Sequence, residues 1–567
     1  MQLYRAGIAA VAAVAMTALA ACSGGSASGA KGHPSAAGHQ GGTLTLLTLD
    51  NPGSVDTAIN YGTAWAEENI VYDGLMAYQK TTGSAGNKLV PDLATAIPTP
   101  TDAAKTYAFH IRQHIRYSNG TTLKPSDVTN TFERMFKVHG PTAGAFYRGI
   151  AGAPACLAKP PTCDLSTGIV ANDSANTVTF HLLAPDGEFL DKLALAFAFV
   201  VPSSAPNTDV GNNAMPGTGP YMFKQYTPNK QIKLVRNPYF KEWSPAAQPK
   251  GYPDTIVLAF GLPLEGAITE VENNQADAVV SAESLPADRL NELSTKYASR
   301  THLNSATAIF YMALNVQVAP FNNIKVRQAV NYAADRNALV KIQGGPKLAV
   351  PSCQVLPPQF PGYQQYCPYT ASPAPGGRGP WKAPDMAKAR SLVAASGTKG
   401  QTVTIVNPNT PLGKSTGVYF EGLLNKLGYK ASLKLLAPEV ANTFVKDSRH
   451  KVQITTTIWY QDYQAASDFL VPLTGCAGFR PESGANANIS EFCDHKSSAD
   501  MDRALALQVR DPTAANQLWA NIDREVTNQA PMVVMFNPKV VTFVSARVGN
   551  FKYNSQWGPL WDQTWVQ

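Results

Sequence analysis

The chain is too long to fold around a single hydrophobic core. It has 567 residues, whereas one core stops growing at about 250–300 residues, so at least two packed lobes are expected. Apolar residues make up 44% of the sequence and charged residues 15%. Intrinsically disordered chains combine low hydrophobicity with high net charge. The composition therefore predicts a folded protein.

The basic residues are dispersed along the chain. The formal net charge is +7, and no two Lys or Arg residues are adjacent. Because a nucleic-acid groove requires clustered basic residues, we do not expect nucleic acid as a partner.

The first 22 residues have the features of a bacterial export signal. Arg5 precedes an apolar run from Gly7 to Ala21, which is shorter than the roughly 20 residues of a membrane-spanning helix. The run ends in Leu19-Ala20-Ala21-Cys22, which resembles the lipobox of bacterial lipoproteins. We predict a signal peptide at 1–21, a lipid on Cys22 and a flexible tether over 22–42. The alternative is an ordinary signal peptide with a chance cysteine.

The remaining cysteines have the pattern of an exported protein. Six are left besides Cys22, an even number that suits a disulfide framework. None forms a CxxC motif, so we predict no zinc site. Joining nearest neighbours is the simplest pairing, and it gives Cys156–Cys163, Cys353–Cys367 and Cys476–Cys493.

Strand and helix patterns alternate through the body of the chain. Hydrophobic periodicity predicts strands near 41–47, 107–111, 177–182, 231–235, 255–260, 403–406, 431–436 and 452–458. It predicts helices near 64–72, 128–136, 326–340, 386–395 and 418–427, the second capped by Ser126-Asp127. A Pro/Gly-rich connection covers 371–384. This alternation predicts mixed α/β lobes.

Two short motifs raise the possibility of metal binding or catalysis. His110 and His114 have the spacing of a metal pair on a helix, but on the predicted strand they would lie about 13 Å apart. We therefore predict no metal site. Gly413-Lys414-Ser415-Thr416-Gly417 matches the GxSxG nucleophile elbow. We favour the alternative that Ser or Thr caps a helix from Val418 onward.

Asp462 is the strongest candidate for binding a ligand. It follows the predicted strand at 452–458 and is flanked by Trp459, Tyr460 and Tyr463. A carboxylate can hold a ligand amine while aromatic rings pack against the ligand. The alternative is an exposed loop acid beside core aromatic residues.

Four separated elements together resemble the extracytoplasmic solute-binding proteins of ABC importers, of the oligopeptide/dipeptide-binding type (family 5). They occur in the family's order along the chain. The first is Tyr107–Arg112 with Tyr117–Gly120 and Ser126–Val128, and the second is Gly217–Tyr221 with Leu234–Phe240. The third is Asn315, Pro320-Phe321, Val326–Ala329 and Ala334–Arg336, and the fourth is Trp459, Asp462-Tyr463 and Asp468–Leu470.

The resemblance implies an α/β, bilobal periplasmic-binding-protein-like (class II) fold with an additional domain and mixed sheets flanked by helices. The ligand would lie between two lobes that close by hinge motion. The implied parts are lobe I (43–76, 206–300 and 526–567), domain II (77–205) and lobe III (301–525).

The resemblance also implies site residues and partners. Asp462 would hold the ligand's α-amino group and Trp459 would line the site, with Tyr460, Tyr463 and Asn315 as further ligand-binding candidates. Peptide-binding members can carry an Arg in the strand before this Trp, where this chain has Thr455–Ile458.

We therefore expect a monomeric, lipid-anchored protein on the extracytoplasmic face that delivers a peptide-like solute to an ABC permease, without cofactor or catalysis. One alternative is the same fold binding an oligosaccharide or another non-peptide solute. The other is a secreted serine hydrolase that uses Ser415.

Overall fold

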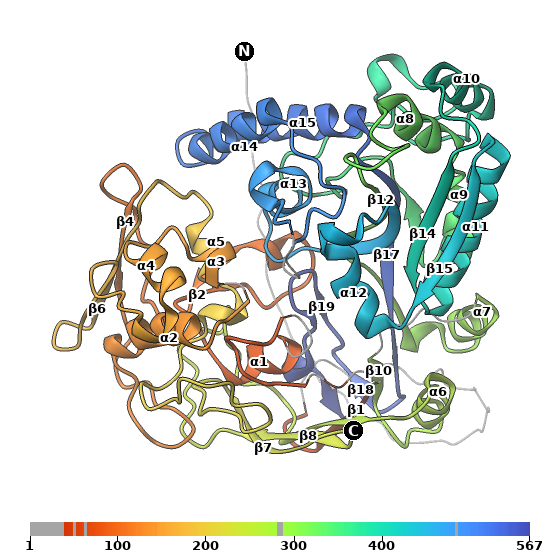
Figure 1. The fold of residues 1–567 in the computed structure, drawn as a ribbon. Helices are drawn as coiled ribbons and strands as arrows, with labels where there is room; N and C mark the ends of the chain where they lie inside the picture. The colour runs from red at the N-terminus through yellow and green to blue at the C-terminus, as the bar shows by residue number, and fades with distance from the viewer. Residues whose placement is uncertain are drawn as a thin grey trace, which may run out of the picture. The chain divides into compact units, whose positions relative to one another are not determined.

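A twelve-stranded mixed sheet forms the centre of the fold (Figure 1). The strand bounds are β1 Thr43–Thr48, β7 Tyr221–Thr227, β8 Gln231–Arg236, β9 Thr255–Phe260, β10 Ala278–Val280, β11 Thr301–Ser305, β12 Ala308–Leu314, β13 Ala349–Pro351, β14 Thr402–Pro408, β15 Lys430–Leu436, β16 Ile454–Tyr460 and β17 Met532–Val544. Ten strands follow the order β15-β14-β16-β12-β17-β10-β1-β9-β8-β7, and β11 and β13 also pair with β17.

This is a computed structural model, and it describes residues 39–48, 51, 53–61, 65–141, 143–280, 287–481 and 486–567. The predicted signal peptide, Cys22 and the tether up to residue 38 lie outside the described residues. Within the described part, no helix is both long and apolar enough to cross a membrane.

The long strand β17 joins two halves of the sheet. We call the strands β1 and β7 to β11 the first half, and the strands β12 to β16 the second half. Its first part pairs with β12 and β13, and its last part pairs with β11 and β10. The short connection from β11 to β12 runs beside it, where the Ala306 N–H donates to the Pro538 carbonyl at 3.1 Å. Two neighbouring stretches of chain therefore cross between the two halves of the sheet.

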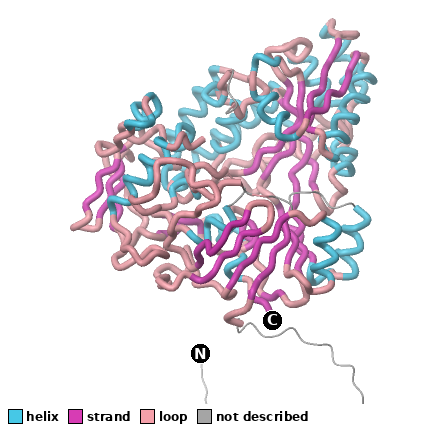
Figure 2. The backbone as a smooth tube through the Cα atoms, turned by 60° about the horizontal axis from the view of Figure 1, so that its bottom comes forward, coloured by secondary structure: helices cyan, strands magenta, loops and turns pink. Residues whose placement is uncertain are grey.

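Helices cover both faces of the second half of the sheet (Figure 2). β12 is buried along its whole length, and because side chains alternate along a strand, its residues enter two separate cores. Phe310 and Met312 belong to the core shared with α8, α9, α10 and α11, whereas Ile309 and Tyr311 belong to the core shared with α13, α14 and α15. The helix bounds are α8 Ile324–Ala333, α9 Arg336–Ile342, α10 Met386–Ser396, α11 Pro411–Leu427, α12 Pro438–Lys446, α13 Ser467–Thr474, α14 His495–Gln508 and α15 Pro512–Gln529.

The first half of the sheet has its own apolar core. β1 pairs in parallel with β9 and β10, and α6 (Leu264–Glu272) and α7 (Ala287–Lys296) contribute to a core under these strands. The helix α1 (Trp65–Val71) packs into a larger core that continues into residues 77–205.

Residues 77–205 form smaller sheets with short helices. β4 (Thr106–His110), β6 and β5 make a three-stranded antiparallel sheet, against which α2 packs. The remaining elements are β2 Met76–Tyr78, β3 Leu89–Pro91, β5 Ile169–Asn172, β6 Thr177–His181, α2 Pro125–Lys137, α3 Ala143–Phe146, α4 Ala153–Ala158 and α5 Phe189–Lys192, and near the C-terminus β18 Val548–Gly549, β19 Tyr553–Asn554, β20 Gly558–Pro559 and β21 Trp565–Val566.

The predicted α/β fold with mixed sheets flanked by helices is confirmed. The structure also joins the six cysteines as predicted, in the pairs Cys156–Cys163, Cys353–Cys367 and Cys476–Cys493. The chain from Gly38 to Gln567 forms one compact unit, and the predicted division into lobe I, domain II and lobe III stays a prediction.

Three predicted helix boundaries were wrong. The stretch 326–340 is two helices, because the Asp335 side chain accepts hydrogen bonds from the N–H groups of Asn337 and Ala338 and starts a new helix. The helix predicted from Ser126-Asp127 begins earlier, and the Asp127 carboxylate accepts the Lys124 N–H at 2.9 Å from inside the first turn. The helix predicted at 418–427 begins at Pro411.

Candidate functional site

Asp462 is a buried carboxylate just beyond the end of β16, with 5% of its surface exposed. The hydroxyl of Tyr61 donates to this carboxylate and lies 2.8 Å from each oxygen. The backbone carbonyl of Asp462 accepts a hydrogen bond from the Gln556 side chain. Contacts from two distant parts of the chain therefore meet at this residue.

Asp468 positions the loop that carries Asp462. Its carboxylate accepts the Asp462 N–H at 2.8 Å, and its carbonyl accepts the Trp459 indole N–H at 3.0 Å. Burial raises the pKa of Asp462 to about 7. Burial and the nearby Asp462 charge raise the pKa of Asp468 well above its usual value.

Tyr61 links this carboxylate to a group of aromatic rings from distant segments, which contact one another. We call them the aromatic cluster: Tyr61, Trp65, Phe146, Phe197, Phe199, Tyr463 and Trp557. The Tyr61 ring lies 6.0 Å from Trp65 and 5.6 Å from Phe197, centroid to centroid. Further contacts link Trp65 to Trp557 at 6.4 Å and Phe146 to Tyr463 at 6.1 Å. An acid beside stacked rings can bind a cation through charge and through the ring faces.

Several polar atoms near Asp462 have no hydrogen-bond partner among the described residues. They include the indole nitrogens of Trp65 and Trp557 and the side-chain oxygen of Gln461. The Gln461 amide nitrogen is used, since it donates to the Ser555 carbonyl at 2.9 Å. Buried polar groups are normally satisfied, so these atoms offer hydrogen bonds that water or a ligand could complete.

Tyr460 lies beside the segment that contains Tyr553. It is the last residue of β16, and 53% of its surface is exposed. Desolvation by the surrounding protein raises the pKa of its phenol. Burial and the nearby Tyr460 phenol raise the pKa of Tyr553, at the start of β19. An exposed aromatic ring at this position is open to contact with a ligand.

The structure brings Trp459, Tyr460, Asp462 and Tyr463 together but not Asn315. In the β12–β16 pairing, Ala308 lies opposite Tyr460 and Leu314 lies opposite Ile454, so Asn315 follows the opposite end of the strand. Its side-chain oxygen accepts the Gln317 N–H at 2.9 Å. This geometry supports a structural role for Asn315 in a turn, and its predicted ligand contact remains without support.

Sequence reasoning missed half of the site. Tyr61, Trp65, Phe197 and Trp557 are separated from Asp462 by long stretches of chain, and none belongs to a motif with a chemical meaning. Glu188 was missed as well; it is 2% exposed and accepts hydrogen bonds from Ser467 at 2.5 Å and Tyr463 at 3.3 Å. Only the tertiary fold reveals these neighbours.

The geometry does not support the serine-hydrolase alternative. Ser415 is exposed and lies inside α11 rather than at a turn between a strand and a helix. The predicted cap is also wrong, since Thr410 caps this helix through the Gly413 N–H. A nucleophile elbow requires a sharp turn at the serine, and a helix interior does not provide one.

The basic residues before β16 are also engaged. The Arg449 guanidinium forms hydrogen bonds with the Asp447 carboxylate at 2.9 and 3.1 Å. Within β16, Thr455 and Thr456 are buried and carry no charge. A fixed cation for a ligand carboxylate is therefore not provided by β16 or by Arg449.

The described residues contain one group of three potential metal ligands, Cys476, Cys493 and His495. Both cysteines are joined in a disulfide, so they are not thiolate ligands.

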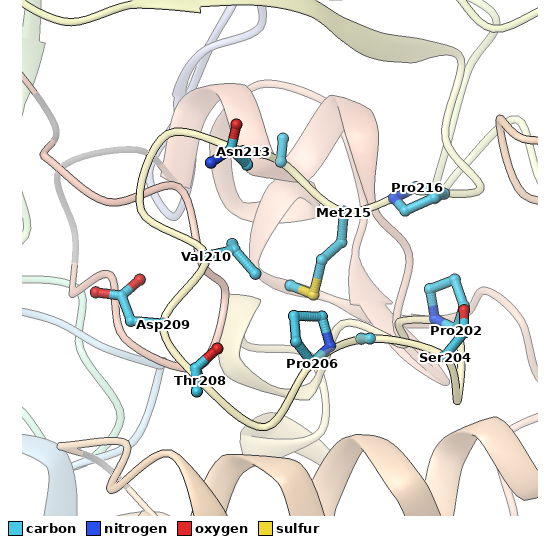
Figure 3. Close-up of a pocket in the computed structure, with 11 residues that line it drawn as sticks. Pro202, Ser204, Pro206, Thr208, Asp209, Val210, Asn213, Met215 and Pro216 are labelled. Carbon is cyan, nitrogen blue, oxygen red and sulfur yellow. The ribbon is translucent and has the colours of Figure 1, made fainter.

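A separate cavity of about 400 Å³ lies within the segment from Pro202 to Pro216 (Figure 3). The side chains of Met215 and Pro206 point into it from opposite sides. The loop is held by Arg134, which donates to the Pro206 carbonyl at 2.7 Å and forms a buried pair with Asp56. None of the predicted ligand-binding residues lines this cavity.

Comparisons with known proteins agree with this arrangement. The di/tripeptide-binding protein 3 of Pseudomonas aeruginosa (strain UCBPP-PA14) is 23% identical over 544 residues, covering 91% of this chain and 93% of the relative. A solved structure called clavulanic acid biosynthesis oligopeptide binding protein 2 superposes with a TM-score of 0.83 at 24% identity, covering 93% of this chain and 96% of the other.

A binding protein of A. tumefaciens R10, solved in complex with agropinic acid, superposes with a TM-score of 0.72 at 21% identity. That alignment covers 93% of this chain and 99% of the other. Similarities at this level of identity establish the shared fold.

The family model described as bacterial extracellular solute-binding proteins, family 5 Middle, matches residues 88–481. This range contains Asp462, Asp468 and Glu188, and it covers more than half of the chain. The chain belongs to the family 5 bacterial extracellular solute-binding proteins, and it is a solute-binding protein rather than an enzyme.

Proposed function

We propose that this protein captures a peptide-like solute by its free α-amine at Asp462 and delivers it to an ABC permease. The observation that carries the proposal is the buried Asp462 carboxylate, which Tyr61 links to the aromatic cluster. An ammonium group that reaches this carboxylate forms a charge pair shielded from water, which binds more strongly than an exposed pair. The relatives named as di/tripeptide-binding and dipeptide-binding proteins support a peptide ligand.

The loop with Gln461 and Asp462 contacts the segment that follows β17. Gln461 and Asp462 follow β16 in the second half, and both contact the segment 555–556, which follows the long strand β17. The two halves could close on each other by bending at β17 and at the connection from β11 to β12. Such a closure would enclose a ligand held at Asp462.

The absence of a cation in β16 has a consequence for the ligand. Because Arg449 is paired with Asp447, we expect the ligand's carboxylate to contribute less to binding than its amine. A C-terminally amidated peptide should therefore bind nearly as well as the free acid.

The test uses Asp462→Asn, which keeps the side-chain shape and removes the charge. Native mass spectrometry of wild type with a di- and tripeptide library identifies a binder, and calorimetry then measures its affinity. We expect at least a 30-fold loss in Asp462→Asn, since removing one partner of a buried charge pair typically costs about 2–5 kcal/mol. N-acetylation of the peptide should weaken wild type similarly, and the two changes together should be less than additive.

Asp209→Asn is the matched control. Asp209 is exposed, lines the separate cavity and accepts a hydrogen bond from Ser54 at 2.6 Å. It should leave affinity unchanged. Equal affinity of wild type and Asp462→Asn for the peptide would overturn the amine anchor and favour a non-peptide solute such as the agropinic acid seen in one structural relative.

We also propose that the mature protein begins at a lipidated Cys22, which rests on the sequence Leu19-Ala20-Ala21-Cys22. Cys22→Ala should abolish labelling with a radioactive fatty acid and release the protein from the membrane fraction or leave the precursor uncleaved. Membrane retention equal to that of wild type would contradict the proposal, because the lipid is the attachment it invokes.

A further inference from the structure

Tyr61 already occupies a hydrogen-bonding position on the Asp462 carboxylate. Its hydroxyl lies at the same distance, 2.8 Å, from both carboxylate oxygens. A donor placed between the two oxygens takes the position in which a ligand ammonium would contact both of them. A ligand amine that reaches Asp462 therefore meets this hydroxyl first.

Tyr61 also shields Asp462 from solvent. Its own side chain is 46% exposed, whereas Asp462 is only 5% exposed. The ring is packed between Trp65 and Phe197 of the aromatic cluster, and this packing aims the hydroxyl at the carboxylate. Tyr61 is thus partly accessible to solvent, while its hydroxyl is engaged in the hydrogen bond to Asp462.

The two donors differ in charge. Burial and the neighbouring Asp462 charge raise the pKa of Tyr61 well above its usual value, so the phenol stays neutral. Exchanging this neutral O–H for a ligand hydroxyl replaces one hydrogen bond with another of the same kind. Exchanging it for an ammonium adds a charge–charge attraction in a site of low water content.

We propose that Tyr61 competes with the ligand for Asp462 and thereby limits this site to ligands with a cationic amine. This inference rests on the proposed amine anchor. Competition lowers the affinity of every ligand that uses Asp462 by one common factor. Amines remain bound in spite of it, whereas an alcohol, which gains nothing from the exchange, falls below useful affinity.

Tyr61→Phe tests the competition, because it removes the hydroxyl and keeps the ring between Trp65 and Phe197. The probes are the library peptide that binds wild type most tightly, its analogue with a hydroxyl in place of the α-amine, and its N-acetyl derivative. The affinities are measured by calorimetry at pH 8, where Asp462 is ionised. This pH is chosen because the Tyr61 hydroxyl also lowers the pKa of Asp462, so removing it would change the protonation of Asp462 at lower pH.

The expected result is an increase of about tenfold in affinity for the amine peptide, the size of one hydrogen bond to a charged group. The hydroxyl analogue should gain by a similar factor. The N-acetyl derivative should gain little or nothing, since it does not use Asp462. In the Asp462→Asn background, Tyr61→Phe should no longer raise the affinity.

Tyr226→Phe is the matched control, because it removes a phenol that donates to the Gly53 carbonyl at 3.0 Å outside the site. It should leave all three affinities unchanged, and circular dichroism and melting temperatures confirm that the variants are folded.

A lower affinity of Tyr61→Phe for the amine peptide would overturn the inference, because it would show that Tyr61 helps to bind the ligand. Unchanged affinity would overturn it as well. If wild type binds the amine and N-acetyl peptides equally, the amine anchor itself fails. If no library peptide binds wild type or Tyr61→Phe, both proposals fail.

Discussion

The hydroxyl of Ser467 donates a hydrogen bond of 2.5 Å to Glu188, although the two residues are 279 positions apart. Ser467 begins α13, directly after the loop that holds Asp462, and Glu188 precedes α5. Tyr463 reaches the same carboxylate at 3.3 Å. The loop carrying the candidate anchor is therefore fastened to residues 77–205 as well as to its own half of the sheet.

The burial of Glu188 predicts that the stability of the protein depends on pH. Burial raises the pKa of Glu188 from 4.5 to about 7, so the folded state binds the proton more tightly than the unfolded state. The resulting stabilisation is complete below about pH 4.5 and is lost as the pH rises through 7. The difference amounts to about 3 kcal/mol.

Glu188→Gln should therefore be more stable than wild type at pH 8 and similar to it at pH 4.5, as measured by urea unfolding. Glu525→Gln is the control, since the exposed Glu525 pairs with Lys496 at 2.9 Å on the surface of α15. It should not change the pH slope. A Glu188→Gln protein with the wild-type slope would show that Glu188 is not the group responsible.

Ligand binding should also depend on pH. With a pKa of about 7, Asp462 is largely protonated at pH 5.5. An ammonium ligand requires the ionised Asp462, so affinity should fall by up to about tenfold per pH unit below 7. Calorimetry in buffers of different ionisation enthalpy should detect proton release at pH 6. In Asp462→Asn, ligand affinity should no longer fall as the pH drops below 7. If the fall persists in this variant, a group other than Asp462 causes it.

Asn315→Ala separates structure from binding. The Asn315 side chain is 3% exposed and accepts the Gln317 N–H. Losing this part-buried hydrogen bond should reduce the free energy of unfolding by about 0.5–1.5 kcal/mol. Peptide affinity should be unchanged, since the residue follows the far end of β12. A tenfold loss of affinity without a change in stability would restore its predicted role as a ligand contact.

The disulfides should contribute to stability according to the loops they close. Cys476 and Cys493 are separated by 17 residues, and Cys156 and Cys163 by 7. In the chain-entropy model, replacing the first pair by Ala should cost about 3 kcal/mol and the second about 2 kcal/mol. Urea unfolding measures both losses. Peptide affinity should survive both replacements, and its loss would mean that a disulfide shapes the ligand site.

Local patterns predicted many of the strands and helices, and they failed at helix boundaries where side-chain hydrogen bonds decide. The alternation of β4 and the periodicity of α10 are visible in the sequence because each buries one apolar face. The strand β12 is apolar throughout and buried on both faces, so no alternation predicts it. The break before α9 depends instead on the cap formed by Asp335. The start of α11 depends on Thr410, three positions before the N–H it accepts. Such caps compete with other polar residues nearby, so periodicity alone does not place them.

The sequence by itself determined that this chain has a mixed α/β fold, that its cysteines pair locally, and that an acid lies among aromatic residues after β16. These features depend on length, on spacing and on neighbours within a few residues. Only the tertiary structure decided that Tyr61 covers Asp462, that Trp557 and Phe197 complete the aromatic cluster, and that Glu188 fastens α13. Those contacts join residues far apart in the chain, and they form because burying the apolar faces of several sheets and helices together brings them into reach.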